Sequence, residues 1–222
     1  MKRCFSLSLL SASLLLSACQ PAPGPSLNAP GAPGANATWS YAGKTGIGTA
    51  YEQYQAGQYQ DQAATGTVSK VWFSLAQGVL TETMAGLIHE AQLRELQLLI
   101  QGKDFVDEEK LAIDSSIDYL HKDAAGRPLS LAYRVSNKAK NGQYQIEKQY
   151  FTDPDGQSMV VRTTVTALAD DLKIYSYLDT ALANTGSGDQ AVYQNDMLHA
   201  VDGNAALTLL TVPAPAQASV GF

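Results

Sequence analysis

The sequence comprises 222 residues, of which 45% are hydrophobic and 16% are charged. This composition suits one globular domain of ordinary to large size with a sizeable core. There are 15 basic and 21 acidic residues, which give a formal net charge of −6. This balance argues against a protein that tracks the phosphates of a nucleic acid, so no nucleic-acid partner is expected.

The N-terminus has the features of a secretion signal. Lys2 and Arg3 precede an apolar run over residues 5–16. The run is too short to span a membrane, and basic residues before a short apolar segment are typical of a signal peptide. We therefore predict a signal peptide over residues 1–18.

The segment Leu16-Ser17-Ala18-Cys19 resembles a bacterial lipobox, in which the cysteine is lipidated and becomes the mature N-terminus. The resemblance implies lipidation of Cys19 and contact with a membrane through that lipid. The alternative is an ordinary signal with a chance cysteine. Because Gln20 rather than aspartate follows, the bacterial sorting rule favours the outer membrane. We expect a cell-envelope lipoprotein that faces the periplasm or the cell surface.

Residues 19–37 are predicted to be a tether. The stretch "QPAPGPSLNAPGAPGANA" after Cys19 contains five prolines, three glycines and no charge. Such a composition forms an extended, semi-stiff linker rather than a packed fold. Residues 38–222 then form the predicted folded domain. Both cysteines, Cys4 and Cys19, lie before it, which excludes a disulfide or a thiolate metal site from the domain.

Short segments with strand periodicity recur along the folded part at a spacing of roughly ten residues. They are residues 68–75, 128–137 (with Leu129, Leu131, Tyr133 and Val135 alternating), 142–151 (with Tyr144, Ile146 and Tyr150 in register), 158–168, 172–180, 190–196, 197–203 and 205–213. Between 151 and 158 we predict a turn, with Pro154 fixed in φ and Gly156 free to adopt a positive φ. Short strands at this spacing are typical of a β-sandwich or barrel.

The segment over residues 81–105 has a different local preference. Leu87, Ala91, Arg94 and Leu98 fall at helical spacing among good helix formers. On the local pattern alone, this segment is predicted to be a helix.

The residues alone reveal no catalytic or metal-binding set. The histidines at 89, 121 and 199 lack partners at metal-ligand spacing, and His89-Glu90 is interpreted as a surface pair. The acidic clusters at 107–109 and 170–171 are interpreted as solvated loops, with a calcium contact as the alternative. The glycines at 46 and 48 are interpreted as a structural turn. We expect no catalytic residue, no cofactor and no metal in this chain.

Four stretches of the chain carry a family resemblance through their order and spacing. They are "WSYAGKTGIGTAYEQY" (39–54), "SKVWFSLAQGVLTET" (69–83), "LRELQLLIQGKDFVDEEK" (93–110) and "LANTGSGDQAVY" (182–193). Together they resemble the N-terminal β-domain of bacterial glucoamylases and glucodextranases, the family 15 glycoside hydrolases. The resemblance spans residues 37–222. The terminal "ASVGF" resembles a segment of that domain after which the domain continues in the family. It implies a strand that begins at Ser219 and a domain that is incomplete at its C-terminus.

The resemblance implies an all-β fold, a large antiparallel β-supersandwich of the galactose mutarotase-like type. In the family this domain precedes an (α/α)6 barrel with two glutamates, one a general acid and the other the activator of a water, so that the anomeric centre is inverted. No part of this chain matches the barrel, so no catalytic residue is carried over. The resemblance also implies a strand over 93–100, against the local helical preference, with room for a short helical turn over 84–92.

The leading hypothesis is therefore the non-catalytic N-terminal part of a lipid-anchored, exo-acting glucan hydrolase, an inverting glucan 1,4-alpha-glucosidase. Its implied partners are an α-glucan of the starch, maltooligosaccharide or dextran type and the catalytic barrel. One alternative is a stand-alone carbohydrate-binding lipoprotein, in which Trp39, Trp72 and some of the 11 tyrosines stack on sugar rings. Another is a mutarotase-like epimerase, which needs a histidine and a glutamate on one sheet face.

Overall fold

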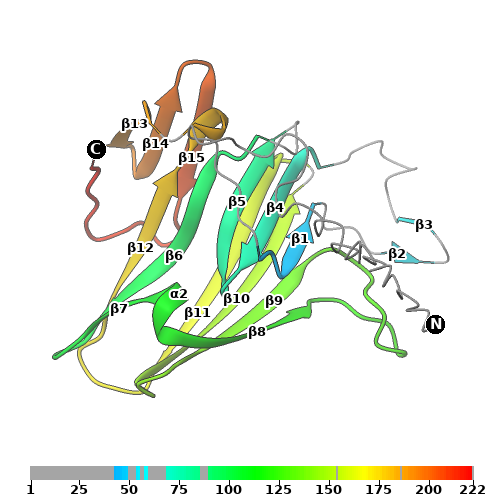
Figure 1. Cartoon of the computed structure of the whole chain (residues 1–222), viewed down its shortest axis with the longest axis horizontal. Coiled ribbons are helices and arrows are strands. Elements are labelled where there is room, and N and C mark those ends of the chain that lie inside the picture. The colour runs from blue at the N-terminus through cyan, green and yellow to red at the C-terminus, as the bar shows by residue number, and fades with distance from the viewer. Residues whose placement is uncertain are drawn as a thin grey trace, which may run out of the picture. The chain divides into compact units, whose positions relative to one another are not determined.

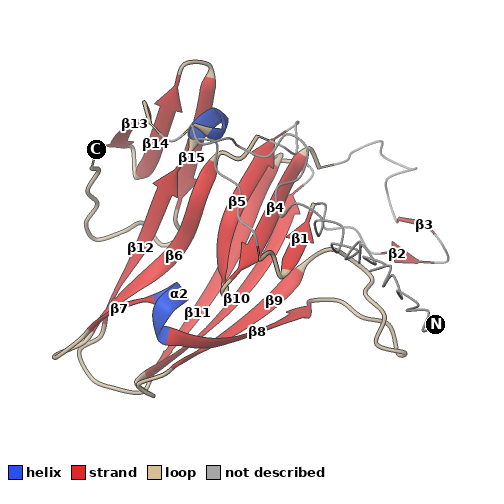
Figure 2. Cartoon of the chain, viewed as in Figure 1, coloured by secondary structure: helices blue, strands red, loops and turns tan. Residues whose placement is uncertain are grey.

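The computed structural model describes most of the predicted folded domain. The described residues are 43–49, 54–55, 58–59, 69–85, 90–153, 155–185 and 187–221, and they all belong to one unit over 32–222. The predicted signal peptide, the tether and Cys19 lie outside them. Strands dominate the described part (Figures 1 and 2), which confirms the all-β prediction.

The described elements follow one another as a series of strands with two short helical turns. They are β1 (Gly46–Gly48), β2 (Tyr54–Gln55), β3 (Gln58–Tyr59), β4 (Val71–Ala76), β5 (Val79–Ala85), β6 (Leu93–Gln101), β7 (Val106–Glu108), α2 (Glu109–Ala112), β8 (Ile113–Tyr119), β9 (Tyr133–Ala139), β10 (Tyr144–Asp153), β11 (Ser158–Ala167), β12 (Lys173–Thr180), the 3-10 turn η1 (Leu182–Asn184), β13 (Gln190–Gln194), β14 (Met197–Asp202) and β15 (Ala205–Leu210).

Two antiparallel sheets make up the body of this unit. The first sheet has the order β1-β4-β5-β6-β12, and β7 also pairs with β6; the second sheet has the order β11-β10-β9-β8. Strands β5 and β7 pair with different parts of β6, whereas β12 pairs along its whole length. Strands β5 and β7 therefore share one edge of β6, and β12 occupies the other edge. A third sheet of β13-β14-β15 and the hairpin β2-β3 complete the described pairings.

The hydrophobic core lies between the first and second sheets. One cluster joins Phe73 and Leu75 of β4 to Tyr133 and Val135 of β9 and Tyr150 of β10. The rings of Phe73 and Tyr133 meet edge to face, with centroids 6.1 Å apart. A second cluster is also shared by the two sheets; its buried members are Leu98, Ile100, Ile113, Ala139, Tyr144 and Ile146. The two sheets thus form a sandwich through their apolar faces.

Most of the predicted strands are confirmed, including the contested one. Residues 93–101 form β6 and not a helix, because Leu93, Leu98 and Ile100 are buried against the second sheet. Burial in a sheet thus overrides the helical preference of the segment. The short helical turn allowed over 84–92 is not seen at 90–92, and residues 86–89 lie outside the description.

Three local predictions were wrong. Strand β9 begins at Tyr133 rather than near Pro128, because the preceding residues form a loop in which the Leu129 N–H donates to the His121 carbonyl. The positive φ after β10 is at Gln157, not Gly156. Residues 219–221 form no strand, since none of them pairs with another described strand.

Candidate functional site

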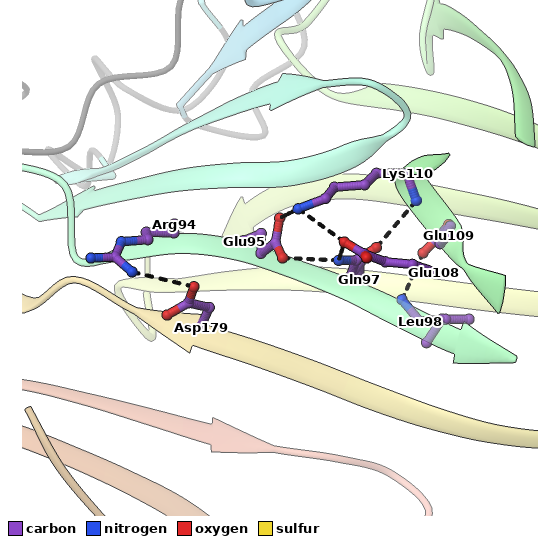
Figure 3. Close-up of polar contacts among 8 residues, drawn as sticks. All are labelled: Arg94, Glu95, Gln97, Leu98, Glu108, Glu109, Lys110 and Asp179. Atoms are coloured by element: carbon purple, nitrogen blue, oxygen red, sulfur yellow. Dashed lines mark hydrogen bonds and ion pairs between the residues drawn. The ribbon is translucent and has the colours of Figure 1, made fainter. Parts of the chain in front are cut away.

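A β-bulge in β6 brings charged side chains together on the face of the first sheet that points away from the core. Glu95 pairs with Asp179 and Leu93 with Thr180, so Arg94 is the extra residue. Its guanidinium Nη1 lies 3.6 Å from Asp179 Oδ2 (Figure 3). Neighbouring strand residues normally point to opposite faces, and the bulge is what allows Arg94 to reach this one.

The outer face of β6 and β12 is polar and aromatic. Leu98 and Ile100 of β6 face the core, so Gln97 and Leu99 between them point outward. Tyr177 pairs with Gln97, and Tyr175 pairs with Leu99. Directly paired residues project from the same face of a sheet. We call this surface the polar face; its members are Arg94, Glu95, Gln97, Glu108, Lys110, Tyr175, Tyr177 and Asp179.

Gln97 organises the centre of the polar face. This fully buried amide donates from Nε2 to Glu95 Oε1 at 2.9 Å and to Glu108 Oε1 at 3.0 Å, and it accepts from the Lys110 N–H at 3.1 Å. The Lys110 ammonium contacts the Glu95 carboxylate and lies 3.0 Å from Glu108 Oε1 (Figure 3). Both Gln97 donors are used, so the two carboxylates are held in fixed positions.

The surroundings of the polar face set its charge. The hydrogen bond from Gln97 and the contact with Lys110 lower the pKa of Glu108. Burial would lower the pKa of Lys110, but hydrogen bonds to Glu95 and Glu108 raise it above its usual value. Burial raises the pKa of Asp179, although Arg94 opposes this. Burial, together with Asp179, also raises the pKa of Tyr177, which therefore stays a neutral phenol at neutral pH.

A second polar group is buried between the two sheets. Glu109 of α2 and Lys148 of β10 are 0% and 3% exposed, and Lys148 Nζ lies 2.5 Å from Glu109 Oε2. The same carboxylate accepts from the Leu98 N–H at 2.8 Å and from Asn137 Nδ2 at 2.7 Å. Asn137 also donates to the carbonyl of Gly78 in the β4–β5 turn. The group satisfies backbone atoms of β6 and of the β4–β5 turn and ties the two sheets together, so its role is structural.

The acidic cluster at 107–109 is therefore not a solvated loop. Glu109 is buried on Lys148, Glu108 belongs to the polar face, and Asp107 accepts from the Tyr144 hydroxyl at 3.0 Å. The sequence contained one sign of this, because Lys148 stands in the buried register of Tyr144, Ile146 and Tyr150. The other cluster, 170–171, is exposed in the loop between β11 and β12, as predicted.

The other sequence candidates do not converge. His121 contacts Ser130 in the loop after β8, and His199 contacts Thr208 across β14 and β15; His89 lies outside the described residues. Within the described ranges, no group of three His, Cys, Asp or Glu side chains could hold a metal ion. No helix among the described residues is long and apolar enough to cross a membrane.

The glycines at 46 and 48 lie in strand β1 and not in a turn. A Cβ at Gly48 would collide with the ring of Phe73 and the carbonyl oxygen of Leu131. Close approach of β1 to the core therefore explains this glycine. A hollow of about 300 Å³ beside the β4–β5 turn is lined by Thr45, Gln77, Ser115 and apolar neighbours, and it offers no acid–base pair.

Comparison with known proteins gives consistent matches. The family model described as glucodextranase, domain N, matches residues 29–222. A glucoamylase of Clostridium sp. (strain G0005) is 31% identical over 182 residues, which cover 78% of this chain and 23% of that protein. The crystal structure of a bacterial glucoamylase complexed with acarbose matches with a TM-score of 0.61 and 29% identity, over 81% of this chain and 25% of that one. The chain spans about a quarter of the length of these relatives.

Proposed function

Because the chain belongs to the glucodextranase domain N family, we propose that it is the non-catalytic N-terminal domain of a lipid-anchored glucan hydrolase that releases glucose from the ends of α-glucans. The observation that carries the proposal is the family match over residues 29–222, which includes every described residue. The relatives matched at 31% and 29% identity are glucoamylases about four times as long as the matched region.

The exposure of the sandwich edges supports a scaffolding role. Strand β12 ends the first sheet, and β11 ends the second. Ile174 of β12 pairs with the buried Ile100 and so faces the core, yet it is 47% exposed. Leu168, just after β11, is 56% exposed. Apolar edges of this kind are normally covered by further structure, and the proposed catalytic barrel and its connecting segment would supply it.

The chemistry is assigned to the barrel and not to the sandwich. Inverting hydrolysis needs one carboxylic acid to protonate the leaving oxygen and one carboxylate to activate a water between them. The carboxylates of the polar face are instead engaged with Lys110, Gln97 and Arg94. These charged and amide side chains hold one another in place, so the polar face offers no free acid–base pair for this reaction.

Glucose release tests the proposal. The 222-residue chain is compared with the product of the natural coding sequence read past codon 222, with soluble starch, maltohexaose and dextran as substrates. We expect no glucose from the 222-residue chain and β-glucose, the inverted anomer, from the longer protein. Glucose release by the shorter chain, a reading frame with no barrel, or an inactive longer protein would contradict the proposal.

The lipid anchor is tested separately. Expression in a Gram-negative host with labelled palmitate should give a labelled protein in the outer-membrane fraction. Cys19→Ser should abolish the label and release the protein, because the thiol that carries the lipid is lost. Cys4→Ser is the matched control and should stay labelled. Labelling that persists in Cys19→Ser would rule out the assignment.

A further inference from the structure

We propose that the polar face binds a short stretch of α-glucan, with Tyr175 and Tyr177 of β12 as its stacking platform. The choice of α-glucan rests on the proposed function, but the site itself is inferred from the surface of the first sheet.

The two tyrosines form a regular pair on one open face. They are two residues apart on β12, so their rings leave the same side of the strand roughly 6.5–7 Å apart. Tyr175 is 45% exposed and Tyr177 is 40% exposed. The core-forming tyrosines 133, 144 and 150 are buried. Aromatic faces give apolar contact to the C–H face of a sugar ring, and this pair could hold neighbouring rings of one oligosaccharide.

The polar groups beside the tyrosines suit hydroxyl groups. The Tyr175 hydroxyl donates to Gln101 Oε1 at 3.2 Å, and Asp179 lies on the same strand two residues beyond Tyr177. The side chains of Arg94 and Asp179 are 34% and 31% exposed, so a ligand on this face can reach both. Charged partners make the stronger hydrogen bonds to neutral hydroxyls.

The charge balance of the polar face favours a neutral ligand. Its three carboxylates are Glu95, Glu108 and Asp179, and its two cations are Arg94 and Lys110, each of which is already paired with a carboxylate. Phosphate or sulfate ligands require cations in excess. A polyhydroxylated, uncharged chain can bind without an excess of cations.

The fixed geometry of the polar face reduces the cost of binding. Gln97 holds Glu95 and Glu108 in place, and the bulge holds Arg94 against Asp179. Side chains that are already ordered lose little conformational entropy when a ligand arrives. This distinguishes the polar face from the outer face of β11, whose exposed residues carry no such network among the interactions described.

Calorimetric titration of the full 222-residue chain with maltohexaose tests the inference, with cellohexaose as the stereochemical control. We expect maltohexaose to bind and cellohexaose to bind much more weakly. Tyr175→Ala and Tyr177→Ala should each weaken maltohexaose binding roughly five- to tenfold. Tyr193→Ala, on β13 of the third sheet, is the matched control and should bind normally.

Tyr177→Phe keeps the ring and guards against an effect of misfolding. It should bind maltohexaose within about twofold of the original chain. The inference is overturned if maltohexaose gives no heat at millimolar concentration, if Tyr175→Ala and Tyr177→Ala bind normally, or if Tyr193→Ala loses as much. The inference is also overturned if Tyr177→Ala abolishes the cooperative unfolding of the longer protein. That result would mean that the rest of the longer protein packs on the polar face and covers it. If the longer protein releases glucose but maltohexaose does not bind to the polar face, this inference fails and the proposed function stands.

Discussion

The buried pair of Glu109 and Lys148 shows how one side chain can serve several elements. The carboxylate meets an ammonium, a backbone N–H of β6 and an amide of β9. Burial lowers the pKa of Lys148, although Glu109 opposes this. Taking both charges out of water is costly, so the pair stabilises the fold only as long as both partners are present.

Lys148→Met should lower the free energy of unfolding by about 3–5 kcal/mol, because it leaves Glu109 buried without a cation. Urea unfolding measures the loss. The double variant Glu109→Gln/Lys148→Met should recover part of it, since neither charge is then buried. Lys122→Met, which breaks the exposed pair with Asp118, is the control and should be nearly neutral. Equal effects at Lys148 and Lys122 would contradict the buried pair.

The core tyrosines make the fold sensitive to alkali. Burial raises the pKa of Tyr133 to about 12 from the ordinary value of 10.0, and it raises the pKa values of Tyr144 and Tyr150 as well. The unfolded chain therefore releases these protons first. Their contribution to stability is complete below pH 10 and is lost as the pH rises toward the folded values. Denaturant unfolding at stepped pH should show the free energy of unfolding falling above about pH 10.

Tyr150→Phe and Tyr144→Phe separate the ionisation from the hydrogen bond. The Tyr150 hydroxyl is buried with no hydrogen-bond partner in the part of the chain described. Its removal should leave stability at pH 7 unchanged or higher and make the alkaline decline shallower. Tyr144→Phe should shallow the decline too, but it should cost about 1 kcal/mol at pH 7, because the bond to Asp107 is lost. A steeper alkaline decline in either variant would refute this account.

At the scale of elements, the β4–β5 turn depends on one glycine. Gly78 has φ +77°, and a Cβ there would lie 2.5 Å from Asn137 Oδ1, 2.7 Å from Ser115 Oγ and 2.8 Å from Ile113 Cδ1. Gly78→Ala should therefore cost about 2–4 kcal/mol, from backbone strain and from the collision together. Thermal and urea unfolding would measure it.

Gly142→Ala is the matched control for this turn. Gly142 has a similar φ of +73°, but nothing lies within 4 Å of the place of its Cβ. The substitution should cost only the strain, about 1–2 kcal/mol. The difference between the two variants measures how tightly the second sheet packs on the β4–β5 turn. Equal costs for the two variants would contradict close packing of the second sheet on this turn.

The sequence predicted the strands better than it predicted the contacts between them. Strands β10 to β15 follow from alternation and turn residues, because these signals are local. The family resemblance was needed for β6, whose own residues prefer a helix. The bulge at Arg94 depends on register with β12, which lies about eighty residues later in the chain. No local pattern encodes that register, and so the polar face could not be predicted from the sequence.

The same holds for the distribution of the tyrosines. Alternation in β10 correctly placed Tyr144 and Tyr150 in the core. In β12 the same alternation leaves Tyr175 and Tyr177 on the outer face, and the choice of face depends on pairing with β6. The sequence could therefore offer sugar contact by the tyrosines only as an alternative, and the fold places some tyrosines in the core and others on the outer face.

At the scale of the whole molecule, two of the edge strands of the sandwich, β12 and β11, leave apolar side chains exposed. Strand β12 pairs only with β6, and β11 pairs only with β10, among the described strands. Val161 and Val165 of β11 pack on the core while partly exposed, and Ile174 of β12 is 47% exposed. An unpaired strand with apolar neighbours is a template for another chain. We therefore expect the 222-residue chain to self-associate through these edges at high concentration.

Ile174→Lys should suppress this association, because a charge that points inward on an edge strand must stay in water and blocks pairing with another strand. Sedimentation velocity over a range of concentrations would show the original chain shifting to larger species and the variant shifting less, since only the β12 edge is blocked. Gln145→Lys adds the same charge to the exposed face of the central strand β10, and it should associate like the original chain. If both lysines acted alike, net charge and not the edge would be responsible. A chain that stays monomeric without either substitution would show that β12 is already protected.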